Sequence, residues 1–178
     1  MNCIPELRTE RLILSGFTLA DADAVYGYAS NPEVAKTVTW EAHKSVEDSR
    51  AFIDFVIAKT SFAPGAVFLA WALREPVQGK AIGSISFSQL SKTSGQIDYA
   101  LGMDYWNRGL MTEAAMKVTN WAWSKFPELL TIQSMCLSNN LGSRRVMEKV
   151  GMRFVALGPS EMPIKGYVRE MAYYSATR

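Results

Sequence analysis

Three β-rich segments in the middle of the chain follow one another with only short turns between them. Turn residues, among them Pro76 and Gly79, fill the two connections. Strands joined by short turns pair antiparallel, so this region predicts a three-stranded meander. The segments are 66–73 (AVFLAWAL), which comes after the turn residues Pro64 and Gly65, then 81–90 (AIGSISFSQL) and 97–103 (IDYALGM).

The second of these segments has two chemically different faces. Ile85 and Phe87 alternate with Ser84, Ser86 and Ser88. Successive side chains of a strand point to opposite sides, so one side of this strand is apolar and the other carries hydroxyl groups. The pattern predicts a strand whose polar side meets water or a ligand.

Helical and β patterns alternate on either side of the meander. Ser45 and Asp48 have the spacing of a capping box and predict the start of a helix over 45–59. The other expected elements are a strand over 11–17, a helix over 18–30 ending before Asn31-Pro32, a helix with an apolar face from Leu110 to Ala122, a strand over 129–137, a helix over 139–151, and strands over 152–158 and 167–175. The order β-α-α-β-β-β-α-β-α-β-β predicts an α/β (α+β) fold with a mixed sheet of about seven strands.

Composition excludes several classes of function. The chain has 178 residues, 48% of them hydrophobic, and a formal net charge of +2, so we expect one domain that binds neither nucleic acid nor a membrane surface. One histidine, His43, and two distant cysteines, Cys3 and Cys136, make neither a metal site nor a disulfide framework. No signal-peptide or membrane-spanning pattern is present, which predicts a cytoplasmic protein. Monomer and homodimer both stay open.

The stretch YWNRGLMTEAAMKV, residues 105–118, places a cation and a glycine at the start of a helix. The unpaired N–H groups and dipole of a helix N-terminus hold anions, and Gly109 lets a phosphate approach the backbone. Arg108 and Thr112 add polar contacts, and the single glycine suits a pyrophosphate. The alternative is an exposed turn in which Glu113 only complements the helix dipole.

Five segments carry a resemblance to a known family: TERLILS (9–15), NPEVAK (31–36), DYALGMDYWNRGLMTEAA (98–115), NNLGSRRVMEKVGM (139–152) and KGYVREMAYYS (165–175). In this order they resemble the GNAT superfamily of N-acetyltransferases, and within it the branch of ribosomal-protein N-terminal alanine/serine acetyltransferases. The third is similar to that branch's pattern GY-x-L-x-x-x-YWG-[KR]-G-Y-x-TEA. The resemblance implies a single acetyltransferase domain over 1–178, with its core at about 8–175, and a mostly antiparallel sheet with helices on both faces.

The same resemblance implies that acetyl-CoA binds in a V between the fourth and fifth strands. The pantetheine arm would meet the backbone near Leu101 and Met103, with Asn140 on its other side. The family's Q/R-x-x-G-x-G/A pattern places Met111 where a small residue is usual, and a methionine turned toward the phosphates would crowd them. The residues expected at the pyrophosphate are Asn107, Arg108, Gly109, Leu110, Met111 and Thr112.

Acetyl transfer needs a neutral amine, a polarised thioester carbonyl and a proton for the departing thiolate. With a pKa of about 7.8 for an α-amine and about 10.4 for lysine, deprotonation at pH 7 costs about 1.1 and about 4.6 kcal/mol. The sequence offers no histidine–carboxylate pair, which favours the α-amine of a protein N-terminus. Two alternatives stay open: a small amine such as an antibiotic, polyamine or amino acid, and a non-catalytic module that binds acyl-CoA.

Many members of the superfamily place a tyrosine seven residues after the motif asparagine, as the general acid. Here that position is Met147, which has no proton to give. Ser143, three residues after Asn140, is the expected substitute and would also contact the cofactor. Its alternative role is to satisfy a backbone amide at the helix start.

The remaining catalytic and acceptor residues also come from the resemblance. Glu170 stands where the branch usually has aspartate and is the expected general base, unless it is a surface charge paired with a neighbouring cation. Trp40, His43 and Tyr105 are expected to border the acceptor cleft. Packing and surface positions are their alternative roles.

Overall fold

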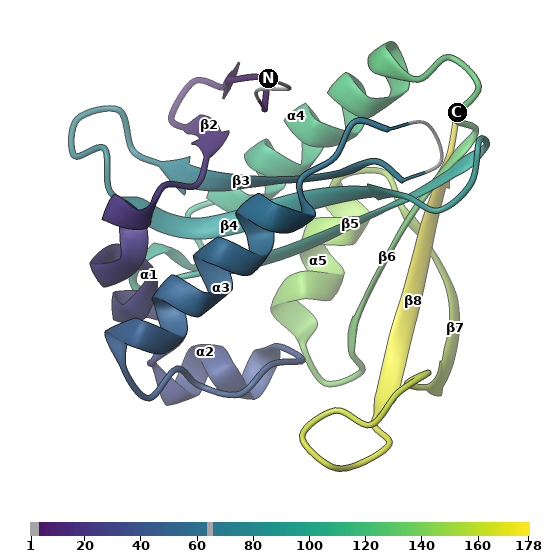
Figure 1. The fold of residues 1–178 in the computed structure, drawn as a ribbon. Helices are drawn as coiled ribbons and strands as arrows, with labels where there is room; N and C mark the ends of the chain where they lie inside the picture. Colours follow the sequence, from purple (N-terminus) through teal and green to yellow (C-terminus); the bar gives the residue numbers. More distant parts are fainter. Residues whose placement is uncertain (1–3, 64–65) are drawn as a thin grey trace.

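The computed structural model describes residues 4–63 and 66–178, which build one sheet with helices on both faces (Figure 1). Across the sheet the strand order is β1-β2-β3-β4-β5-β6-β8-β7. All neighbouring strands pair antiparallel except β5 and β6, which are parallel. The strands are β1 (Leu7–Arg8), β2 (Ile13–Gly16), β3 (Phe68–Arg74), β4 (Ala81–Gln89), β5 (Ser94–Leu101), β6 (Thr131–Leu137), β7 (Arg153–Pro159) and β8 (Glu170–Thr177).

The predicted fold class is confirmed, with one strand more than expected. The additional strand is β1, whose two residues pair with β2, and two residues are too few to give a periodic pattern. The turn at Pro64-Gly65 and the thiol of Cys3 lie outside the described residues. Cys136 is a buried free thiol.

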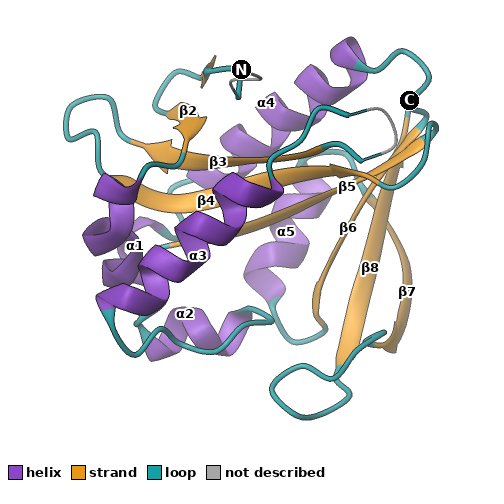
Figure 2. Cartoon of the chain, in the orientation of Figure 1, coloured by secondary structure: helices purple, strands orange, loops and turns teal. Residues whose placement is uncertain are grey.

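Within the described residues, five α-helices cover the two faces of the sheet (Figure 2). The helices are α1 (Ala22–Ala29), α2 (Pro32–Thr37), α3 (Val46–Lys59), α4 (Leu110–Lys125) and α5 (Leu141–Lys149), with short 3₁₀ turns at Leu19–Asp21 and Met103–Tyr105. The capping box predicted for α3 is present, because Ser45 Oγ accepts a hydrogen bond from Asp48 N–H and the Asp48 carboxylate accepts one from Ser45 N–H.

The helix α2 was not predicted. The pair Asn31-Pro32 was interpreted only as the end of the preceding helix, yet it also starts the next one. The Asn31 side chain accepts a hydrogen bond from Glu33 N–H at 2.8 Å, and proline occupies the first helical position, where its missing N–H costs nothing.

The two predicted faces of β4 separate two hydrophobic clusters. Ile85 and Phe87 are fully buried in the larger cluster, together with residues of α4. Alanines of β3, Ala70 and Ala72, belong to the smaller cluster beneath α1 and α3. They pair with Ser86 and Ser84, so the hydroxyl groups of β4 lie on the α1–α3 face.

The only parallel pair among the described strands is short. β5 and β6 are paired from Ser94 with Thr131 to Gln96 with Gln133, and from there they diverge. This divergence opens a V between the fifth and sixth strands in chain order, which are the fourth and fifth of the predicted count. No helix in the described part of the chain is long and apolar enough to cross a membrane.

Candidate active site

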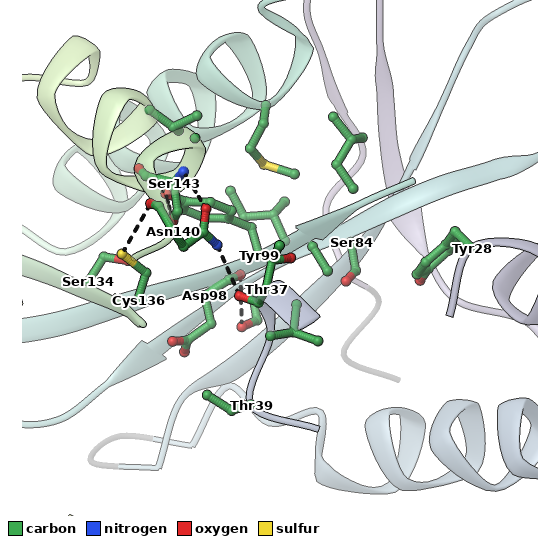
Figure 3. Close-up of a pocket in the computed structure, with 18 of the residues that line it drawn as sticks. Tyr28, Thr37, Thr39, Ser84, Asp98, Tyr99, Ser134, Cys136, Asn140 and Ser143 are labelled. Carbon is green, nitrogen blue, oxygen red and sulfur yellow. Dashed lines mark hydrogen bonds between the residues drawn. The ribbon is translucent and has the colours of Figure 1, made fainter. Parts of the chain in front are cut away.

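A cavity of about 800 Å³ lies at the divergence of β5 and β6 (Figure 3). It extends from the N-terminal end of α4, past α5, to the aromatic side chains of α1 and α3. Most of the site residues expected from the sequence line it: Trp40, His43, Leu101, Tyr105, Asn107, Gly109, Leu110, Met111, Thr112, Asn140 and Ser143. Met103, Arg108 and Glu170 are not among the lining residues.

The start of α4 has the backbone of an anion site. Gly109 is the N-cap residue with φ of 77°, and Asn107 also has a positive φ, 59°. Within the described chain, no acceptor bonds the N–H groups of Leu110, Met111 and Thr112, as expected for the first turn of a helix. A Cβ added at Gly109 would be strained by that φ, whatever the space around it.

Arg11, between β1 and β2, holds the turn before α4 in place. The Glu113 carboxylate accepts hydrogen bonds from the backbone N–H and the Nε of Arg11, at 2.9 and 2.8 Å. Arg11 also donates to the carbonyl oxygen of Arg108 at 2.8 Å. Glu113 therefore fixes the turn through Arg11, beyond any effect on the helix dipole.

Three expected cofactor residues have positions that the sequence did not indicate. Met111 is only 5% exposed and packs in the larger core cluster, so its side chain is directed largely into the protein. The Arg108 guanidinium lies 5.4 Å from the centroid of the Tyr105 ring and lines a separate cavity of about 410 Å³. Met103 lies in the 3₁₀ turn and is exposed.

Asn140 joins two helices. Its Oδ1 accepts a hydrogen bond from Ser143 N–H at 3.0 Å, which caps α5, and its Nδ2 donates to the carbonyl oxygen of Thr37 at 2.9 Å. The side chain thus lines the cavity while its amide ties the end of α2 to the start of α5 (Figure 3).

Ser143 has a hydrogen-bond partner, Tyr99, that the sequence pattern did not predict. The hydroxyl groups of Tyr99 and Ser143 are 2.9 Å apart, and the Tyr99 hydroxyl also donates to the Ser143 carbonyl oxygen at 3.1 Å. Burial raises the pKa of Tyr99 far above its usual value, although the hydrogen bond with Ser143 opposes the shift. The phenol therefore stays protonated. Met147 is buried in the core and offers no proton.

His43 lines the cavity among the aromatic side chains next to α3. Its Nδ1 lies 2.8 Å from Ser49 Oγ, and its ring centroid is 5.5 Å from that of Trp40 and 6.0 Å from that of Phe52. Desolvation lowers the pKa of His43, against the opposing charge of Asp48. The contact of one ring nitrogen with Ser49 thus holds the segment around His43 against α3.

The expected general base and a second carboxylate have different surroundings. Glu170 is exposed at the start of β8 and does not line the cavity. Asp98, which the sequence analysis did not single out, does line it. The signal was present, because Asp98 precedes Tyr99 where the quoted family pattern has glycine.

Comparison with known proteins identifies the family of the chain. Residues 11–153 match the acetyltransferase (GNAT) domain family. The uncharacterized N-acetyltransferase YoaA of Bacillus subtilis is 28% identical over 151 residues, which are 84% of this chain and 83% of YoaA.

Two solved structures share the fold. The microcin C7 self-immunity acetyltransferase MccE, in complex with acetyl-CoA and AMP, has a TM-score of 0.82 at 18% identity and covers 96% of this chain and 94% of its own. RimL, the ribosomal L7/L12 α-N-protein acetyltransferase in complex with CoA, has a TM-score of 0.80 at 13% identity and covers 97% and 98%.

The family match spans well over half of the chain. It confirms the superfamily and the enzyme class that the five sequence segments predicted. The chain belongs to the GNAT family of acetyltransferases and is an N-acetyltransferase.

Proposed function

We propose that this enzyme transfers the acetyl group of acetyl-CoA to the α-amine of a protein or peptide N-terminus. One observation carries the proposal: a single cavity joins the unpaired amides of α4 to the aromatic segment around Trp40, through the divergence of β5 and β6. A donor bound at the helix end and an acceptor entering past α3 would meet at that divergence.

The residues on the donor side fit a CoA thioester. The N–H groups of Leu110, Met111 and Thr112 would hold the pyrophosphate, with Gly109 giving access to the backbone. Beyond Gln96 the edge of β5 is free of β6, and its backbone would accompany the pantetheine arm past Leu101. Arg145 and Lys149 of α5 add two cations to the same cavity, which suits a ligand that carries several phosphates.

The proton for the thiolate would come from the pair Ser143 and Tyr99. A CoA thiol with a pKa near that of cysteine, about 8.5, needs only one hydroxyl donor to leave at neutral pH. Ser143 lines the cavity, and the protonated Tyr99 is hydrogen-bonded to it. Ser143 would donate to the sulfur, and the Tyr99 phenol would stabilise the serine oxygen.

The α-amine is favoured over a lysine side chain because its deprotonation at pH 7 costs about 1.1 rather than about 4.6 kcal/mol. The fold likeness to RimL, an α-N-protein acetyltransferase, supports the same class of acceptor and a place in the ribosomal-protein branch. A small aromatic amine is the second candidate. It is favoured by the aromatic rings on the acceptor side of the cavity: Phe17, Trp40, Phe52, Phe55 and Phe68.

The test is acetylation of matched peptides, read by thiol release and by mass spectrometry. One set carries a free N-terminus and no lysine, and the other a blocked N-terminus and one lysine. We expect the free α-amine to react at least about tenfold faster at pH 7, in line with its lower pKa. Preference for lysine, or turnover of small aromatic amines without turnover of any peptide, would contradict the proposed acceptor.

A further inference from the structure

Asp98 is a carboxylate in the cavity for which the sequence predicted no role. We propose that Asp98 binds the ammonium group of the acceptor and takes its proton before acetyl transfer, and that Gln96 and Gln133 hold the carboxylate in position. This inference rests on the proposed function and assigns the base within the same site.

Its place in the sheet favours this role. Asp98 lies two residues past Gln96, where the pairing of β5 with β6 ends, and it pairs with Ser86 of β4. It therefore lies on the α1–α3 face, in one row with Ser86 and Ala70. Figure 3 shows its carboxylate at the cavity.

Neighbouring residues of a strand point to opposite faces, and here this separates two chemical functions. Tyr99 is directed to α5 and bonds Ser143, whereas Asp98 is directed to the side of α3. An acetyl group at the divergence of the strands would thus have hydroxyl donors on one side and a carboxylate on the other. That arrangement would supply a proton acceptor for the attacking amine and a proton donor for the departing thiolate on two sides of the same carbonyl group.

Neutral amides, rather than a cation, hold the Asp98 carboxylate. Gln96 Nε2 lies 2.9 and 3.0 Å from its two oxygens, and Gln133 Nε2 donates to Gln96 Oε1 at 3.3 Å. Gln96 and Gln133 are the last residues of the parallel pair. Asp98 belongs to none of the ion pairs within the described ranges, so its charge remains available to a ligand.

Asp98 is an exposed residue of β5, and the cavity around it still partly desolvates its carboxylate. Desolvation raises its pKa, although the hydrogen bond from Gln96 and the charge of Lys59 oppose the shift. A carboxyl group whose pKa is closer to that of an amine accepts the amine proton more readily. The other titratable groups that line this cavity are Tyr28 of α1, His43 of the segment before α3, Lys59 of α3, Tyr99 of β5, Tyr105 of the turn before α4, Cys136 of β6, and Arg145 and Lys149 of α5.

The proton balance of the reaction is complete without another reactant. The ammonium group gives one proton to Asp98, and the nitrogen lone pair attacks the thioester carbon. The C–N bond forms, the C–S bond breaks, and the nitrogen loses its second proton. One of these protons leaves to solvent, and the other replaces the proton that Ser143 gives to the thiolate. The products are the amide and the free thiol of CoA.

The experiment compares Asp98→Asn with wild type, and uses Asp54→Asn on the exposed side of α3 as the matched control. Acetyl-CoA affinity is measured by calorimetry, and peptide acetylation is measured from pH 6 to 10. We expect acetyl-CoA affinity within about twofold of wild type. Acetylation at pH 7 should fall about 100-fold or more, the usual range for loss of a general base, and recover as the amine deprotonates at high pH.

Two further variants separate catalysis from folding. Asp98→Glu keeps a carboxylate and should retain the pH profile of wild type at a lower rate. Gln96→Leu should shift that profile toward that of Asp98→Asn while leaving acetyl-CoA affinity unchanged. An Asp98→Asn enzyme within about threefold of wild type over the whole pH range would overturn the assignment of Asp98 alone. A wild-type enzyme that binds acetyl-CoA but acetylates no peptide would overturn the proposed function and this inference together.

Discussion

The hydroxyl group of Tyr99 lies 2.9 Å from the hydroxyl group of Ser143, and this contact joins β5 to α5 across the opening of the sheet. The sequence favoured a serine because the helix position of the usual tyrosine holds methionine. In the structure a phenol is nevertheless present at the site, supplied by a neighbouring strand instead of the helix.

Tyr99→Phe and Ser143→Ala should each lower kcat for acetylation by about 10- to 100-fold, because each removes a hydroxyl group from the same proton path. The KM for acetyl-CoA should change little. Since the two residues act as a unit, the double variant should be no slower than the slower single variant. Steady-state kinetics of the three variants measures this, and multiplicative losses would show that the two hydroxyl groups act independently.

Gly109→Val should weaken binding of acetyl-CoA by about tenfold or more. A β-branched residue at φ of 77° is strained by an amount on the order of 1–3 kcal/mol, and its side chain would cover the amides of the helix start. Calorimetric titration with acetyl-CoA provides the measurement.

The matched control is Gly166→Val. Gly166 has a φ of 79° and open space around it, and it lies between β7 and β8 and does not line the cavity. This variant should lose stability but keep its affinity for acetyl-CoA. Equal affinities of the two variants would contradict the assignment of the pyrophosphate to the start of α4.

Asn140→Ala should lower the free energy of unfolding by about 1–2 kcal/mol, because α5 loses its N-cap and the Thr37 carbonyl loses its donor. Asn140→Asp keeps a capping oxygen and loses only the donor, so it should recover most of the difference. Denaturant unfolding of the three proteins measures both values. A loss of stability in Asn140→Asp as large as that in Asn140→Ala would contradict the capping role.

Asp98→Asn should be slightly more stable than wild type at pH 7, because solvent screens much of the effect at this exposed residue. The folded-state pKa of Asp98 is raised above 3.8, so the folded protein binds the proton more tightly than the unfolded chain does. The stability that this proton provides is complete below pH 3.8 and is lost as the pH rises through the folded-state pKa. The midpoint temperature of the variant should therefore exceed that of wild type at pH 7, and the difference should shrink below pH 4.

The pKa of Asp21 is shifted in the opposite direction, so its contribution to stability has the opposite pH dependence. Burial works against its ionisation, but the hydrogen bonds and charge of Arg74 and the bonds from Thr18 lower its pKa below 3.8. This carboxylate stabilises the folded protein above pH 3.8, and its contribution is lost as the pH falls through the lowered pKa. Asp21→Asn should be less stable than wild type at pH 7, because it leaves the largely buried Arg74 guanidinium without its partner.

Alternation and helical spacing predicted the elements that bury a continuous face. The serines and apolar residues of β4 fell on the sides that the pattern indicated. Elements of two and six residues, β1 and α2, are too short for such a pattern, and Pro32 starts a helix where it was interpreted only as ending one.

The site was predictable wherever it depends on local backbone. Gly109 and the first turn of α4 have the geometry that the sequence implied. Asp98 was not predicted as a site residue. The alternation of side chains along a strand assigns it to one face of the sheet, but it does not tell where β5 and β6 separate. Glu170 was correctly predicted to lie on a strand. Whether the start of that strand faces the cavity depends on how β8 pairs with β6, and a local sequence pattern does not contain this pairing.

The most direct test of the account is a crystal structure of this enzyme with CoA linked covalently to the α-amine of a short peptide. We predict that the diphosphate lies against the amides of Leu110, Met111 and Thr112, and that the linking nitrogen lies at the divergence of β5 and β6, beside Asp98. A diphosphate bound elsewhere, for example in the smaller cavity lined by Arg108 and Arg11, would contradict the account.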